Sequence, residues 1–253
     1  YFLDYALEND AIYVHHGWSP QAQSDISKLG VNNINGIQES SKNFWRVKDK
    51  YAPHNLFTST ASILEIAKRK GYETTSQKES VLNYVAYEYD LAEKYGKQEE
   101  TDTTNTVENN TDQTTEVLDA TTITIPHSQL QTVKYEYNPE TKTYIRYARG
   151  KLQTDYITGE PVTTKNIIIT KCNNYTLTTD TEGKGRQGLN NIGTFDGYYI
   201  TNGKAIPIKC TKSARNAQTI YKDLAGNEIE VNDGNTFINI CPVDAKVKID
   251  GAQ

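Results

Sequence analysis

Three of the four histidines in this 253-residue chain fall in two short segments, residues 14–22 and 44–55. The same segments contain both tryptophans and Arg46, so imidazole, indole and guanidinium groups occur close together in the sequence. An imidazole can act as a general base. A guanidinium beside an aromatic ring can hold a carboxylate or a sugar acid in a fixed plane. We therefore treat these two segments as the candidate functional site.

These residue types allow two kinds of site. In the first, one polar cleft binds a ligand and is lined by His15, Gly17, Ser19, Gln21, Arg46, His54 and Asn55. In the second, His15 or His54 is the general base of a hydrolase or transferase, and Arg46 stabilises an anion or oxyanion. Ser19 precedes a proline and is typical of a helix cap, so no activated nucleophile accompanies the histidines. Binding is therefore favoured, and catalysis is the alternative.

Other roles for the same side chains stay open. Arg46 could form an ion pair with Asp25 or Glu39 instead of binding a ligand. Trp18 and Trp45 could belong to a hydrophobic core or could form a platform for a ligand. The sequence does not decide between these roles.

The sequence predicts neither a metal site nor a cofactor. Adjacent residues of a strand point to opposite faces, so His15 and His16 cannot both ligate one ion. A site made of His15, His54 and Asp25 matches none of the standard zinc spacings. No Gly-x-Ser-x-Gly motif is present either. We expect the histidines to bond to nearby backbone if they do not contact a ligand.

Local signals predict the elements that position these residues. Residues 11–15 are β-branched and aromatic, which is typical of a buried strand, and Gly17 turns the chain after it. Ser19 followed by a proline predicts a capped helix that ends at Gly30. A second capped helix is expected to start near Ser59 and to end, after a basic last turn, at residue 71.

The composition changes along the chain. Residues 97–122 are mostly Thr, Asn, Glu, Asp and Gln, so they cannot bury enough surface to offset their ordering entropy. We predict a flexible polar linker or loop there, between an αβ domain at residues 1–96 and a β-rich domain at residues 123–253. In the second domain, alternation predicts a hairpin at 133–147 and strands at 166–170, 175–179, 197–200, 205–209 and 236–240. The expected fold class is α+β with a mostly antiparallel C-terminal part.

Charge and hydropathy exclude some classes of protein. The net charge is -5 and the basic residues are scattered, which argues against a nucleic-acid surface. No run of about eighteen apolar residues is present to span a membrane. Three widely spaced cysteines, Cys172, Cys210 and Cys241, offer no CxxC pair, and we expect them to be buried in strands. Because the chain begins at Tyr1 without a leader, we expect a fragment or a mature product.

Several longer motifs carry a resemblance. They are Asp10-Ala11-Ile12-Tyr13-Val14-His15, Ser19-Pro20-Gln21-Ala22, Phe44-Trp45-Arg46, Ala52-Pro53-His54-Asn55, Tyr144-Ile145-Arg146-Tyr147, Gly203-Lys204-Ala205-Ile206-Pro207-Ile208 and Gly234-Asn235-Thr236-Phe237-Ile238. With these motifs the chain resembles the YerB-like lipoproteins of Gram-positive bacteria, over nearly its whole length apart from the predicted linker. That family has no established activity, so the resemblance implies no catalytic residue.

The resemblance implies a setting. It indicates an extracytoplasmic protein with an N-terminal αβ domain and a C-terminal β-rich domain, attached to the membrane by a lipidated cysteine upstream of Tyr1. It also implies that an earlier part of the N-terminal domain precedes this chain. We therefore expect a binding or scaffold module whose partner is a cell-wall or envelope component, either protein or glycan. The alternative is an envelope hydrolase or transferase that uses His15 or His54 with Arg46.

Overall fold

The computed structural model describes residues 1–96, 115–180 and 183–250. Contacts divide the chain into two units, residues 1–81 with 214–218, and residues 82–213 with 219–253. Few helices and many antiparallel strands give the α+β fold that the sequence predicts. The predicted domain boundaries at residues 96 and 123 stay a prediction, and the contacts group residues 82–96 with the second unit. Most of the predicted linker, residues 97–114, lies outside the described residues.

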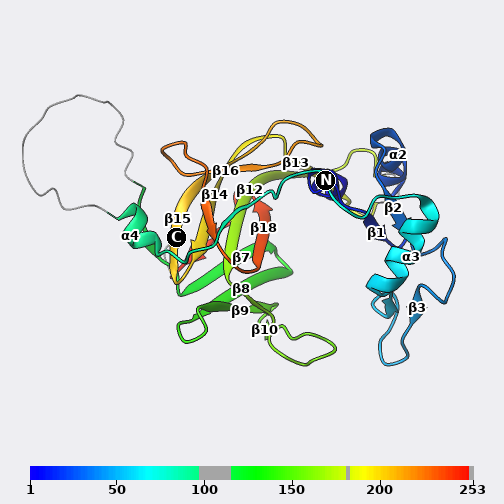
Figure 1. The fold of residues 1–253 in the computed structure, drawn as a ribbon, viewed down its shortest axis with the longest axis horizontal. Coiled ribbons are helices and arrows are strands. Elements are labelled where there is room, and N and C mark those ends of the chain that lie inside the picture. The colour runs from blue at the N-terminus through cyan, green and yellow to red at the C-terminus, as the bar shows by residue number, and fades with distance from the viewer. Residues whose placement is uncertain (97–114, 181–182, 251–253) are drawn as a thin grey trace, which may run out of the picture. The chain divides into compact units, whose positions relative to one another are not determined.

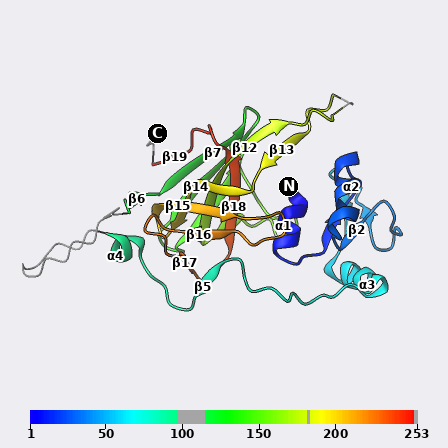
Figure 2. The ribbon, with the colours of Figure 1, turned by 90° about the horizontal axis from the view of Figure 1, so that it is seen from above.

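The first unit is a small αβ structure (Figures 1 and 2). Its elements are α1 (Phe2–Glu8), β1 (Tyr13–His15), α2 (Pro20–Leu29), β2 (Asn33–Asn35), β3 (Trp45–Arg46), β4 (Leu56–Phe57) and α3 (Thr60–Lys70). β1 and β2 are parallel, and α2 connects them. β3 and β4 form an antiparallel pair in which Arg46 lies opposite Leu56. Both predicted capped helices are confirmed. The strand predicted at residues 11–15 is present as β1, but it covers only residues 13–15 and its side chains are half-buried instead of buried.

The helix ends show why the local signals predicted them well. The side chains of Ser19 and Ser59 each accept a hydrogen bond of 3.1 Å from a backbone N–H in the first turn of α2 or α3. α2 ends at Gly30 with φ of +64°, and α3 ends at Gly71 with φ of +69°. Glycine adopts this left-handed conformation without a steric cost. None of the helices in the described part of the chain is long and apolar enough to cross a bilayer.

Two small cores lie on opposite faces of β1 and β2. Because successive strand residues point to opposite faces, Tyr13 packs on one side and Val14 on the other. The first core contains residues of α1 and α2, namely Leu3, Leu7, Ile26 and Leu29. The second contains Ile34, Phe44, Ile63 and Ile66, of which the last two belong to α3. The short parallel pair is therefore covered on both faces.

The second unit is β-rich. It contains α4 (Leu91–Tyr95), β5 (Asn83–Val85), β6 (Leu118–Asp119), β7 (Thr122–Ser128), β8 (Gln131–Asn138), β9 (Thr143–Ala148), β10 (Lys151–Leu152), β11 (Thr163–Thr164), β12 (Asn166–Thr176), β13 (Gln187–Asn190), β14 (Gly193–Thr201), β15 (Lys204–Lys212), β16 (Ile220–Lys222), β17 (Glu230–Asn232), β18 (Thr236–Pro242) and β19 (Lys248–Ile249). The predicted hairpin is confirmed as β8 and β9. The separate strand predicted at 175–179 is wrong, because β12 continues to Thr176 and pairs there with β13.

Two sheets enclose the main core of this unit. One has the order β10-β9-β8-β7-β19, and the other has the order β13-β12-β14-β15-β16, with β18 parallel to β12. In Figure 1 the strands β7, β8 and β9 of the first sheet are green, and the strands of the second sheet run from yellow-green at β12 to red at β18. Fully buried side chains from both meet between them, among them Ile123 and Tyr135 from one sheet and Ile167 and Ile200 from the other. The unit is therefore a sandwich with an apolar interior.

The three cysteines are free and buried in β12, β15 and β18, as predicted. Burial raises the pKa of Cys172 and Cys241 to about 11 and that of Cys210 to about 12.

A thiol reagent at about pH 8 should therefore label the native protein far more slowly than the guanidinium-unfolded chain, because only the thiolate reacts. The contribution of the three thiols to the free energy of unfolding should be fully present below the unfolded thiol pKa of about 8.5 and should be lost as the pH rises through the folded values. Equal labelling rates for native and unfolded protein would contradict this expectation.

Candidate binding site

A pocket of about 530 Å³ lies in the first unit beside the carboxyl ends of β1 and β2. His16 directly follows β1, and Gly36 and Ile37 directly follow β2. Ligands of open sheets with parallel strands bind at this edge. The pocket is lined by His16, Gly36, Ile37, Glu39, Ser41, Phe44, Trp45, Arg46 and Leu56.

One buried amide fixes the two loops at this edge. The side-chain oxygen of Asn35 accepts hydrogen bonds from the backbone N–H of Gly17 at 3.0 Å and of Ile37 at 3.1 Å. Asn35 is only 2% exposed, so these bonds form in a protein interior where they are costly to lose. Gly17 has φ of +77°, which glycine adopts without strain. The loop after β1 and the loop after β2 are therefore held in a defined arrangement.

The inner wall of the pocket depends on a glycine. A Cβ atom at Gly36 would lie 2.7 Å from Phe44 Cδ1 and 3.2 Å from His16 Nδ1. Atoms do not pack this closely, so any larger residue would displace the Phe44 ring. Phe44 is 8% exposed and belongs to the core that includes Ile34 and Ile66. The pocket is thus built on the core of the unit.

Arg46 is held in one orientation by two neighbours. Its Nη1 donates to Asn55 Oδ1 at 2.6 Å, and its Nη2 donates to His16 Nε2 at 3.4 Å. Asn55 is itself fixed, because its Nδ2 donates to the Val47 carbonyl at 3.3 Å. A guanidinium has five N–H groups, and these two contacts engage two of them within the described residues. The exposed side chain of Arg46 therefore retains donors for a ligand.

The charge of the pocket comes from Arg46. Glu39 also lines the pocket, but its side chain is 5% exposed and forms an ion pair with Arg69 of α3. Asp25, the other carboxylate that the sequence offers to Arg46, pairs with Arg215 at 2.9 Å. Neither predicted ion-pair partner is thus engaged by Arg46, and the guanidinium contributes a positive charge that neighbouring carboxylates do not cancel.

His15 has a different environment from His16. Its Nδ1 donates to the Gly17 carbonyl at 2.7 Å, and its Nε2 lies 3.1 Å from Asn33 Oδ1. The ring stacks on Tyr13 at 4.9 Å and lies 5.6 Å from the ring of Trp18. Both nitrogens therefore face oxygen atoms of the protein, and the side chain fastens the Gly17 turn to β2.

The seven predicted ligand-binding residues occupy several places. Arg46 lines the pocket, and Asn55 orients the Arg46 guanidinium. Ser19 caps α2, and Gln21 lies half-buried in the first turn of that helix. His54 is exposed in the loop between β3 and β4. The prediction that all seven line one cleft stays a prediction, and the pocket itself adds His16 and Trp45, which the predicted ligand-binding set omits.

No metal centre is built from these side chains. Across residues 1–96, 115–180 and 183–250, no group of three or more His, Cys, Asp or Glu residues is arranged to hold an ion. The polar groups that line the pocket are one guanidinium, one imidazole, one hydroxyl and the ion-paired carboxylate of Glu39, beside aromatic and aliphatic surfaces.

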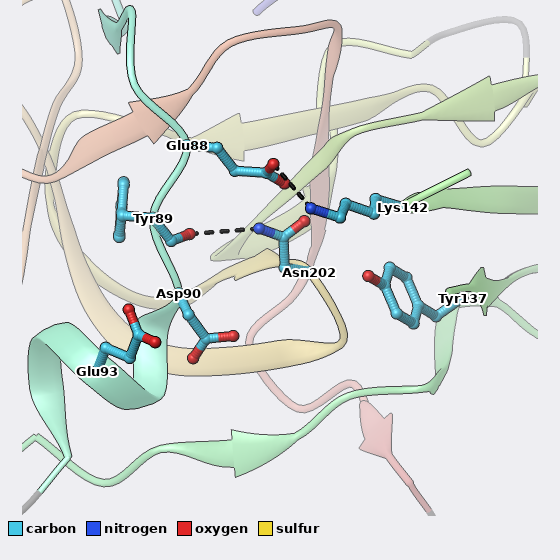
Figure 3. Close-up of a pocket in the computed structure, with 7 residues that line it drawn as sticks. All are labelled: Glu88, Tyr89, Asp90, Glu93, Tyr137, Lys142 and Asn202. Carbon is cyan, nitrogen blue, oxygen red and sulfur yellow. Dashed lines mark hydrogen bonds and ion pairs between the residues drawn. The ribbon is translucent and has the colours of Figure 1, made fainter. Parts of the chain in front are cut away.

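A second pocket, of about 290 Å³, lies in the β-rich unit (Figure 3). It is lined by Glu88, Tyr89, Asp90, Glu93, Tyr137, Lys142 and Asn202. No sequence pattern predicts this pocket, because its residues come from α4 and the segment before it, from β8 and the turn after it, and from the turn after β14.

The polar groups of the second pocket mostly contact one another. Glu88 forms ion pairs with Lys165 at 2.7 Å and with Lys142 at 2.9 Å. Hydrogen bonds from Lys165 and then Lys142 lower the pKa of Glu88 to about 2. Figure 3 shows Glu88 directed at Lys142, and Asn202 directed at the Tyr89 carbonyl, to which it donates at 3.3 Å. These groups fasten one segment of the unit, so the pocket of the first unit is the stronger candidate for ligand binding.

Comparison with known proteins identifies relatives. Residues 1–73 match the N-terminal domain, and residues 121–238 the C-terminal domain, of a protein of unknown function (DUF3048). The chain is 26% identical over 250 residues to "Putative lipoprotein YerB" of Bacillus subtilis (strain 168), covering 96% of this chain and 64% of that protein. The chain therefore spans less than two thirds of this relative's length.

The relatives share the fold as well. A crystal structure of the YerB protein from Bacillus subtilis matches with a TM-score of 0.74 at 23% identity, covering 98% of this chain and 73% of that chain. The resemblance inferred from the sequence motifs is thus confirmed. At this identity the structural match shows a common fold.

Proposed function

Since the chain belongs to the two-domain family of unknown function DUF3048, we propose that it is the envelope-facing part of a lipoprotein and serves there as a binding or scaffold module. Its partner in this proposal is a cell-wall or envelope component. The name of the Bacillus relative supports the lipoprotein setting. The observation that carries the binding role is the pocket at the ends of the two parallel strands, where Asn55 and His16 hold the Arg46 guanidinium in one orientation.

Binding explains the site better than catalysis. A general base needs a ring nitrogen that can reach a substrate, and both nitrogens of His15 face protein oxygen atoms. Ser19, the hydroxyl nearest to His15 in sequence, accepts the capping hydrogen bond of α2. His54 is exposed. The alternative of a hydrolase or transferase that uses His15 or His54 with Arg46 therefore lacks support from contacts, because among the described residues no hydrogen bond joins either of these histidine side chains to Arg46.

Cosedimentation with purified Bacillus subtilis sacculi tests the binding role. We expect the protein to pellet with sacculi, and a variant with both Trp45→Ala and Arg46→Gln to stay in the supernatant. Lys48→Gln is the matched control, because it removes an exposed positive charge from the same hairpin without changing the pocket lining. A wild-type protein that stays in the supernatant would refute binding to the wall. The lipoprotein setting requires that the full-length protein is recovered with membranes and is cleaved by protease added to intact protoplasts.

A further inference from the structure

We infer that the pocket of the first unit binds a peptide carboxylate that lies next to an apolar side chain. The inference rests on the proposed binding function and names the ligand chemistry of that site. It joins two features of the lining, an oriented guanidinium and an apolar wall.

The guanidinium selects an anion with two acceptor oxygens. Asn55 and His16 each engage one terminal nitrogen of Arg46, which fixes the plane of the group before a ligand arrives. A planar, oriented guanidinium matches a carboxylate through two parallel hydrogen bonds. Because Arg69 balances the charge of Glu39, the field at the pocket favours an anion over a cation.

The apolar wall indicates what accompanies the carboxylate. Ile37 is 62% exposed and Trp45 is 38% exposed, and both line the pocket with Phe44 and Leu56. Exposed apolar surface at a pocket gains free energy when an apolar group covers it. A polyol phosphate polymer would present hydroxyl groups to this wall, whereas a peptide end presents its last side chain. The combination therefore fits a peptide carboxylate better than a phosphate of a polar polymer.

The size of the pocket is consistent with this ligand. Small-molecule sites measure about 300–1,000 Å³, and the pocket of about 530 Å³ falls within that range. It has room for a short peptide end but not for a folded domain. The site would thus bind the C-terminal end of an extended peptide.

Tryptophan fluorescence can report binding directly. The chain has two tryptophans, so Trp18→Phe leaves Trp45, which lines the pocket, as the single reporter. An N-acetylated tripeptide ending in leucine is titrated as the free acid and as the C-terminal amide, and glycerol 3-phosphate serves as a phosphate source. We expect saturable binding of the acid, and at least about tenfold weaker binding of the amide and of glycerol 3-phosphate. Calorimetry on the wild-type protein repeats the comparison without the reporter.

Variants test whether Arg46 makes the distinction. Arg46→Gln should weaken binding of the acid by about tenfold and should leave binding of the amide unchanged. Lys48→Gln, the matched loss of charge on the same hairpin, should leave both affinities unchanged. Arg46 is exposed, so far-UV circular dichroism should show that its variant folds.

The outcomes separate this inference from the proposed function. Equal affinity for acid and amide, or tighter binding of glycerol 3-phosphate, would overturn the peptide carboxylate as ligand. If sacculi still bound in an Arg46-dependent way, the binding function would stand with a different ligand. If the acid peptide bound and sacculi did not, the ligand chemistry would stand and the cell wall would be the wrong partner.

Discussion

Replacing Arg215 with alanine should lower the free energy of unfolding of the first unit by about 3 kcal/mol, at the lower end of the cost of breaking a buried ion pair. Arg215 lies in residues 214–218, which belong to this unit although they are far from it in sequence. Its Nε donates to Asp4 of α1 at 2.7 Å, and its Nη1 donates to Asp25 of α2 at 2.9 Å. One guanidinium thus joins the two helices on one face of the β1–β2 pair.

The size of the effect follows from burial. The side chain of Asp4 is 4% exposed, so its negative charge has little access to water once the guanidinium is removed. Arg215 itself is 35% exposed, which is why we expect the lower end of the range. Hydrogen exchange should show loss of protection in α1 and α2, with protection of β12 and β14 unchanged.

Asp25→Asn is the control for this substitution. Asp25 is 33% exposed, and losing a partly exposed ion pair should cost less than about 1 kcal/mol. Arg215→Lys keeps the charge but replaces the planar guanidinium with a single ammonium. Its loss of free energy of unfolding should therefore lie between those of Arg215→Ala and Asp25→Asn. Unchanged protection of α1 in Arg215→Ala would show that the contact contributes little to this unit.

Local elements could be predicted from the sequence, because their causes are local. The boundaries of α2 and α3 follow from a serine cap at one end and a glycine in the left-handed conformation at the other. Arg215 could not be linked to Asp4, because the two residues are 211 positions apart and no pattern in a single sequence joins them. The strand β5 could not be predicted for the same reason, because it pairs with β17, which lies far along the chain.

In the candidate site, too, local features could be predicted from the sequence and tertiary contacts could not. Alternation along β1 predicts that His15 and His16 face opposite sides of the strand. Which of them meets a pocket depends on where Phe44 and the β3–β4 pair pack, and this is a tertiary property. Arg46 could be singled out because an aromatic residue precedes it, and its partner Asn55 lies just before β4, the strand that pairs with β3. The sequence could thus identify the arginine but not the wall beside it.

Asn232→Ala should loosen the attachment of residues 82–96 to the rest of the β-rich unit. It should lower the free energy of unfolding of this segment by about 3 kcal/mol. Asn232 is fully buried, and its Oδ1 accepts from the Tyr89 backbone N–H at 3.0 Å. Its Nδ2 donates to the Tyr89 carbonyl at 3.0 Å and to Thr201 Oγ1 at 3.2 Å. Alanine would leave the Tyr89 N–H without its acceptor and would open a small cavity.

The result can be measured by hydrogen exchange in residues 82–96. Their amides should exchange faster in Asn232→Ala, whereas those of β7 and β8, in the other sheet, should keep their protection. Asn83→Ala is the matched control, because it makes the same chemical change on β5 at an exposed side chain and should have little effect. Since Tyr89 also lines the second pocket, a loosened segment would open that pocket too. If Asn232→Ala and Asn83→Ala exchanged at the same rate, the buried amide would not be what holds the segment in place.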